Sequence, residues 1–213
     1  MPDSVNTGTP RRSNVAKEGA ARLPEPVDLG PAEQERLLAL ARVTVSVAAG
    51  SLPAGSLESE LHREPLPERH AAAFVTLEEQ GELRGCMGVM DPEAPAWASV
   101  VQAARWAARD DPRFPPVEAS ELHAIEIEIS ILGPLVRLED PLAFRLGTDG
   151  VVVRRNGRRG LLLPEVAGMH GMDRAAMLDT CCRKAGLPVG AWREAGSEVF
   201  AFRTRRFGGP AVT

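Results

Sequence analysis

The chain has 213 residues, 44% hydrophobic and 25% charged, with a formal net charge of −4. This composition is typical of a soluble globular protein, and the acidic balance argues against nucleic-acid binding, which favours an overall basic field. No apolar run approaches the length of a membrane span, and three cysteines, two of them adjacent, cannot form a disulfide framework, so we expect a cytoplasmic protein.

The N-terminal segment differs in composition from the rest of the chain. Residues 1–28 are rich in Pro, Gly, Ser and Asn and carry both charge signs. Such a segment buries little apolar surface, so we predict a disordered tail followed by a single folded domain over residues 29–213. From Pro31, apolar residues at helical spacing behind an acidic first turn predict a helix. Residues 50–67, with Pro and Gly punctuation, predict a loop.

The next stretch carries the most informative motif, R-G-C at residues 84–86. An apolar run at 72–77, a turn at Gln80–Gly81 and a second run to Met90 predict a β-hairpin. Strict alternation would place Arg84 and Cys86 on one face of the second strand, and Leu83 with Met87 and Val89 on the other. The flanking glycines, Gly85 and Gly88, predict a bulge or a close backbone approach and leave the thiol little side-chain cover.

Two interpretations of this motif remain open. A cation near a thiolate stabilises it, so Arg84 predicts a lowered pKa for Cys86. The alternative is a small apolar cysteine in a sheet, with Arg84 paired to a carboxylate.

A helix is predicted over residues 95–110, with a stripe of apolar and small residues that allows close packing on a sheet. The sequence D-P-R-F-P-P at 111–116 ends it, because a residue before proline disfavours the helical conformation. This connection is either a rigid linker or a loop that presents Asp111 and Arg113 near a site.

Residues 125–131 alternate isoleucine with polar side chains and predict a strand. Its polar face, with Glu126, Glu128 and Ser130, is either solvated or lines a cleft. In the second case Glu128 or Ser130 would act as an acid, a base or a hydrogen-bond partner.

Asn156–Gly157 between two apolar runs predicts a second hairpin over residues 150–163, and four arginines crowd its turn. They would either grip a phosphate or form a solvated tip. A helix is predicted from an N-cap at Asp173 to Ala185, with one or both of Cys181 and Cys182 in the core, and a last strand over residues 198–204. No histidine or cysteine spacing indicates a metal site, and no nucleotide motif indicates a cofactor.

Several stretches in this order resemble the AMMECR domain family, known in microbes as AmmeMemoRadiSam system protein A. The resemblance covers about residues 31–207 and is carried by F-V-T-L (74–77), L-R-G-C-M-G (83–88), D-P-R-F-P-P-V (111–117), E-I-S (128–130), G-T-D-G (147–150), G-L-L-L-P-E-V (160–166) and C-R-K-A-G-L (182–187). The chain departs from the family at Met87, at Met172, where a tryptophan is common, and at Cys181, which is extra.

The resemblance implies an α+β fold of two subdomains, each an antiparallel sheet with packed helices, the larger containing both chain ends. It places the R-G-C-x-G segment in a cleft near their junction. By position in the family's motifs, the candidate catalytic residues are Cys86, Arg84 and Glu128. The candidate binding residues are Gly85, Gly88, Asp111, Arg113, Ser130 and Glu165.

The functional expectation is an enzyme, or a component of one, with a reactive Cys86 that acts with a Memo-type protein and a radical SAM protein. The alternative is a non-catalytic module of that system that binds a small anion or a partner. A thiol pKa well below about 8.5 would favour the enzyme, and an inert thiol would favour the binding module.

Overall fold

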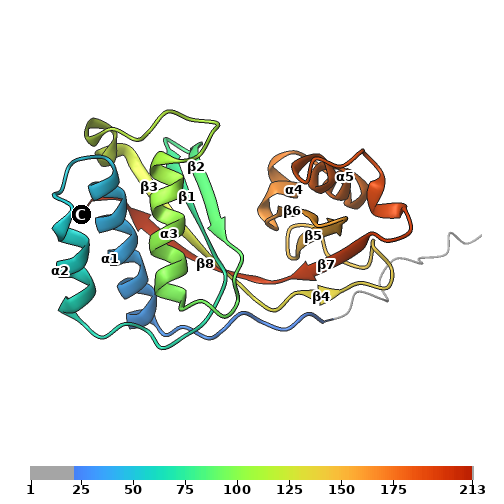
Figure 1. The fold of residues 1–213 in the computed structure, drawn as a ribbon, viewed down its shortest axis with the longest axis horizontal. Helices are drawn as coiled ribbons and strands as arrows, with labels where there is room; N and C mark the ends of the chain where they lie inside the picture. Colours follow the sequence, from blue (N-terminus) through green and yellow to red (C-terminus); the bar gives the residue numbers. More distant parts are fainter. Residues whose placement is uncertain (1–21, 213) are drawn as a thin grey trace, which may run out of the picture.

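The structure, a computed structural model, describes residues 22–212 and contains two four-stranded antiparallel sheets that lie side by side with their own helices (Figure 1). The strand orders are β2-β1-β3-β8 and β4-β7-β5-β6. The α+β class predicted from the sequence is therefore confirmed. Within the described residues, no helix is long and apolar enough to cross a bilayer.

The first sheet buries one face against two helices. It consists of β1 (Ala73–Glu79), β2 (Glu82–Val89), β3 (Ile125–Leu132) and β8 (Thr204–Pro210), and the helices are α1 (Pro31–Ala48) and α3 (Ala96–Arg109). The alternate isoleucines of β3 are buried in this core together with Val75 and Leu77. Since strand side chains alternate, Thr76 and Glu128 lie on the opposite face, which we call the open face.

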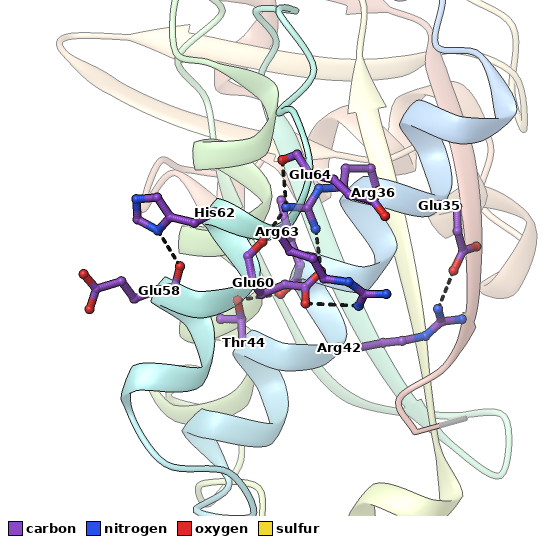
Figure 2. A network of polar contacts seen from close by, with 10 residues as sticks. Glu35, Arg36, Arg42, Thr44, Glu58, Glu60, His62, Arg63 and Glu64 are labelled. Carbon is purple, nitrogen blue, oxygen red and sulfur yellow. Dashed lines mark hydrogen bonds and ion pairs between the residues drawn. The ribbon is translucent and has the colours of Figure 1, made fainter.

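A short helix, α2 (Gly55–Arg63), occupies the region predicted to be a loop. Arg36 of α1 is buried and donates to the Glu60 carboxylate and to the backbone carbonyls of Glu60 and Glu64, at the end of α2 (Figure 2). A helix leaves its last carbonyls without partners, and Arg36 supplies donors for them. The prediction was wrong because this contact comes from another helix and leaves no local pattern.

The second sheet consists of β4 (Val136–Arg137), β5 (Gly150–Arg155), β6 (Arg158–Leu162) and β7 (Glu198–Phe202). Its helices are α4 (Glu165–Met169) and α5 (Arg174–Lys184), and short 3-10 turns lie at η1 (Ala119–Ala124), beside the first sheet, and at η2 (Ala191–Arg193). The Asn156–Gly157 turn and the Asp173 cap, which accepts the N–H of Ala176, are as predicted. Residues 198–204 do not form the last strand, because the chain continues into β8.

The two sheets meet in a third apolar cluster. The cluster joins Val152, Leu161 and Phe202 of the second sheet to Leu132 of β3 and to Ala72, the residue before β1, and Phe74 lies beside them. One end of the open face is thus covered by the second sheet. The first regular element, α1, packs against the first sheet, and the last, β8, is one of its strands, while division into two subdomains stays a prediction.

The expected tail over residues 1–28 falls partly outside the structure, since residues 1–21 are not among those described. Residues 22–28 differ from the expectation. Leu23 is buried in the core of the second sheet, and Val27 packs against the core of the first. The expectation fails because it rests on the average composition of the segment, whereas two single apolar residues in it pack against the cores.

Candidate functional site

The β1–β2 pairing contains a bulge beside the candidate cysteine. Thr76 lies opposite Cys86 and Leu77 opposite Gly85, but Glu78 lies opposite Leu83, so Arg84 is the extra residue. The bulge predicted from the glycines is confirmed. Because Thr76 and Glu78 share one face of β1, Cys86 and Leu83 lie on the same face, and the predicted alternation across Arg84 is wrong.

Arg84 binds the segment that follows α3 rather than the thiol. Its Nε and Nη2 donate to the two carboxylate oxygens of Glu121 at 2.7 and 3.1 Å, and its Nη1 and Nη2 donate to the carbonyls of Pro115 and Pro116. The bond from Arg84 lowers the pKa of Glu121. The alternative interpretation therefore holds for Arg84, which is paired to a carboxylate. The prediction that it activates Cys86 is wrong.

The two glycines permit close packing. A Cβ atom on Gly85 would lie 2.3 Å from the carbonyl oxygen of Ala107 in α3, and one on Gly88 would lie 2.4 Å from the Phe74 ring. Real Cβ atoms do not approach other atoms so closely, so both positions require glycine. Gly85 lets β2 contact α3, and Gly88 lets the Phe74 ring lie against β2.

Asp111 and Arg113 hold the backbone of Cys86. Asp111 Oδ2 accepts the N–H of Cys86 at 2.9 Å, and Arg113 Nη2 donates to the carbonyl of Cys86 at 3.1 Å. The Arg113 guanidinium also donates to both Asp111 oxygens, at 2.9 and 2.7 Å. Since β2 is an edge strand, this pair satisfies groups that a neighbouring strand would otherwise bind. Of the two readings of the loop, the structure shows the one that brings both residues to Cys86.

The thiol of Cys86 is half-buried and is not activated by its surroundings. Burial raises its pKa, and this effect outweighs a hydrogen bond from the Thr76 hydroxyl (3.3 Å) and the charges of Arg113 and Lys184. Burial alone would also raise the pKa of Asp111, but the bonds from Arg113 and the Cys86 N–H lower it to about 2. Asp111 is thus too weak a base to remove the thiol proton at neutral pH.

A second polar group lies further across the open face. Glu128 is two strands from Cys86, about 10 Å by ordinary strand spacing, and its carboxylate accepts from Arg206 of β8. Arg206 Nη1 also lies 3.8 Å from Glu165 Oε2 of α4. Burial raises the pKa of Glu165, and the nearby carboxylates of Glu128 and Glu78 raise it further.

The remaining candidate, Ser130, faces the same side but is almost fully buried. Its hydroxyl has no hydrogen-bond partner within residues 22–212. Beside Glu128 lies a hollow of about 300 Å³, lined by Glu78, Glu126, Ile127, Glu128, Gly208 and Gly209. In the part of the chain that the structure describes, no three His, Cys, Asp or Glu side chains are grouped to hold a metal ion.

The candidate residues thus form two groups. The first is Cys86 with Asp111 and Arg113, and the second is Glu128 with Glu165. Arg84 belongs to neither, because its side chain binds Glu121. Sequence reasoning missed Thr76 and Arg206, which contact the first and second groups. Thr76 could have been found by aligning the hairpin with its bulge included. Arg206 had no local signal, because β8 pairs with a strand more than seventy residues earlier.

Comparison with known proteins agrees with this architecture. The family model described as AMMECR1 matches residues 38–207. A protein of Methanothermobacter thermautotrophicus is 43% identical over 140 residues, which are 63% of this chain and 73% of that protein. Protein NEQ441 of Nanoarchaeum equitans is 38% identical over 64% of this chain and 80% of its own length.

A solved structure shares the fold as well. The crystal structure of the uncharacterized protein PH0010 from Pyrococcus horikoshii superimposes with a TM-score of 0.73 at 30% identity, covering 85% of this chain and 95% of that one. The match to the family model extends over both sheets and includes every candidate site residue. The chain belongs to the AMMECR1 family.

Proposed function

We propose that this chain is a partner-binding component of the AmmeMemoRadiSam system. Its acidic face, defined as Glu78, Glu126, Glu128 and Glu165, would bind a Lys- or Arg-bearing segment of the radical SAM protein or the Memo-type protein. The observation that carries the proposal is that Glu78, Glu126 and Glu128 line one hollow on the open face, while Glu165 lies close by, across Arg206 from Glu128.

Charge and shape both favour a cationic group there. Arg206 is shared between Glu128 and Glu165, so one arginine faces several carboxylates. The hollow beside Glu128, about 300 Å³ in volume, is large enough for an ammonium or guanidinium group. An arriving ammonium or guanidinium group would relieve repulsion among the carboxylates and gain charge-assisted hydrogen bonds.

The surroundings of Cys86 favour binding over covalent catalysis. The side chain of Arg84 binds Glu121, and those of Asp111 and Arg113 bind the backbone of Cys86. None of the three is positioned to take the thiol proton. A nucleophilic cysteine needs a lowered pKa or an adjacent base.

Thiol chemistry is the second candidate, and one observation favours it. Cys86 is half-buried, whereas Cys181 and Cys182 are fully buried, and the charges of Arg113 and Lys184 act to stabilise a thiolate. A partner that added a base to the open face would complete such a site.

The test is binding of the full chain to purified Memo-type and radical SAM proteins of the same organism, by isothermal titration calorimetry. The double variant Glu78→Gln/Glu126→Gln should bind at least about tenfold more weakly than the unmodified chain, and added salt should weaken binding of the unmodified chain. The matched control, Glu58→Gln/Glu68→Gln, removes two exposed carboxylates elsewhere and should bind normally. Absence of any complex, or equal affinity of both double variants, would overturn the proposal.

A further inference from the structure

A larger hollow lies at the other end of the open face, where the two sheets meet. It has a volume of about 710 Å³, within the range of small-molecule sites. Its apolar wall is formed by Met90, Leu132 and Leu135 from the first sheet and its connections, and by Phe200 of β7. Met90 is four residues beyond Cys86, about 13 Å along an extended chain, so this hollow is separate from the thiol.

One cation, Arg154 of β5, borders the apolar wall. Its guanidinium stacks on the Phe200 ring, 4.7 Å from the centroid. Across the strands, Arg154 lies between Arg159 of β6 and Glu198 of β7. The Glu198 carboxylate is 3.5 Å from Arg137, and within residues 22–212 Arg154 has no ion pair of its own.

An anion would relieve the repulsion between two neighbouring arginines on this hairpin. Arg154 and Arg159 are directly opposite each other, an arrangement in which like charges repel. The other two arginines of this hairpin are on the opposite face and are already bound, Arg155 to Glu194 and Arg158 to the carbonyl of Gly186. Within residues 22–212, neither Arg154 nor Arg159 forms an ion pair.

From this juxtaposition we infer that the hollow binds a small carboxylic acid with an apolar body. The carboxylate accepts from the planar fork of Arg154, which stacking on Phe200 holds in place, and the apolar body lies against Met90, Leu132 and Leu135. Within residues 22–212, neither acidic residue at the rim, Glu25 or Glu93, forms an ion pair with Arg154, and Glu25 lies 3.8 Å from Arg203.

The experiment measures binding of 3-phenylpropionate to the full chain by calorimetry, with 3-phenylpropionamide as the neutral analogue of the same shape. We expect millimolar or tighter binding of the acid, and binding of the amide that is weaker by about tenfold, the effect of losing one charge-assisted pair. Protein-observed NMR shifts should include Met90, Leu135 and Phe200.

Variants locate the carboxylate. Arg154→Gln should weaken binding of the acid by about tenfold and leave binding of the amide unchanged. The control Arg158→Gln, on the opposite face of the same hairpin, should bind both probes normally, as should Glu78→Gln/Glu126→Gln, which keeps this test independent of the proposed partner surface.

Equal affinity for acid and amide, shifts confined to other surfaces, or no binding up to about 10 mM would overturn the inference. Should Arg154→Gln fail to fold, the comparison of the two probes on the unmodified chain still decides it.

Discussion

The Asp111 carboxylate accepts the backbone N–H of Cys86 at 2.9 Å, and so links the loop after α3 to the edge of the first sheet. Arg113 completes the link through the carbonyl of the same residue. The loop thus takes the place of a missing strand, which explains why an edge strand with two glycines keeps a defined path.

Asp111→Asn should destabilise the protein by about 2 kcal/mol at neutral pH, the equivalent of the shift of its pKa to about 2. A carboxyl whose folded pKa is lowered stabilises the fold above its unfolded value, near 4, and this contribution is lost as pH falls from about 4 to about 2. Urea unfolding of the unmodified chain and the variant across that range measures the difference.

The control for this substitution is Asp28→Asn. Asp28 is exposed and pairs with Arg205, so its loss should cost less than about 1 kcal/mol. If Asp111→Asn were as mild as Asp28→Asn, the link between the loop and Cys86 would not support the fold.

Gly85→Ala should destabilise the protein by about 3 kcal/mol, because the new Cβ would meet the Ala107 carbonyl at 2.3 Å and force β2 away from α3. Gly55→Ala, at the start of α2 with nothing within 4 Å, should change stability by less than about 1 kcal/mol. Thermal unfolding followed by circular dichroism compares the two. Equal midpoints would show that β2 and α3 are not in close contact.

Leu23→Ala should cost about 2 to 3 kcal/mol, since the side chain is buried in the core of the second sheet. Leu52→Ala, at a more exposed leucine, should cost much less. Chemical denaturation of both variants provides the measurement. A loss no larger for Leu23 than for Leu52 would restore the expectation that the segment up to residue 28 buries little.

The sequence predicts those elements whose side chains repeat with a local period. The isoleucines of β3, the Asn156–Gly157 turn and the Asp173 cap all follow from such patterns. The helix α2 was missed because a distant arginine, Arg36, completes its end, and β8 was missed because Gly208, Gly209 and Pro210 weaken the strand pattern.

The candidate site was predicted only in part, because some of its contacts depend on strand pairing rather than on a local pattern. The glycines beside Cys86 correctly indicated a bulge, but the position of the extra residue decides where Arg84 points, and that depends on pairing with β1. Likewise, Glu128 and Glu165 were named from the sequence, whereas Arg206, which lies between them, reaches them only through the register of β3 and β8.

The central claim is that Cys86 is a thiol of raised pKa beside a binding surface. The direct test is the rate of Cys86 alkylation by iodoacetamide as a function of pH, followed residue by residue by mass spectrometry. Cys86 should react before the buried Cys181 and Cys182, with an apparent pKa above the ordinary value of a cysteine thiol. Arg113→Gln should slow the reaction, while Arg84→Gln should leave the folded protein's rate nearly unchanged. An apparent pKa well below about 8.5, or a marked loss of rate in Arg84→Gln, would contradict the account and favour a catalytic thiol.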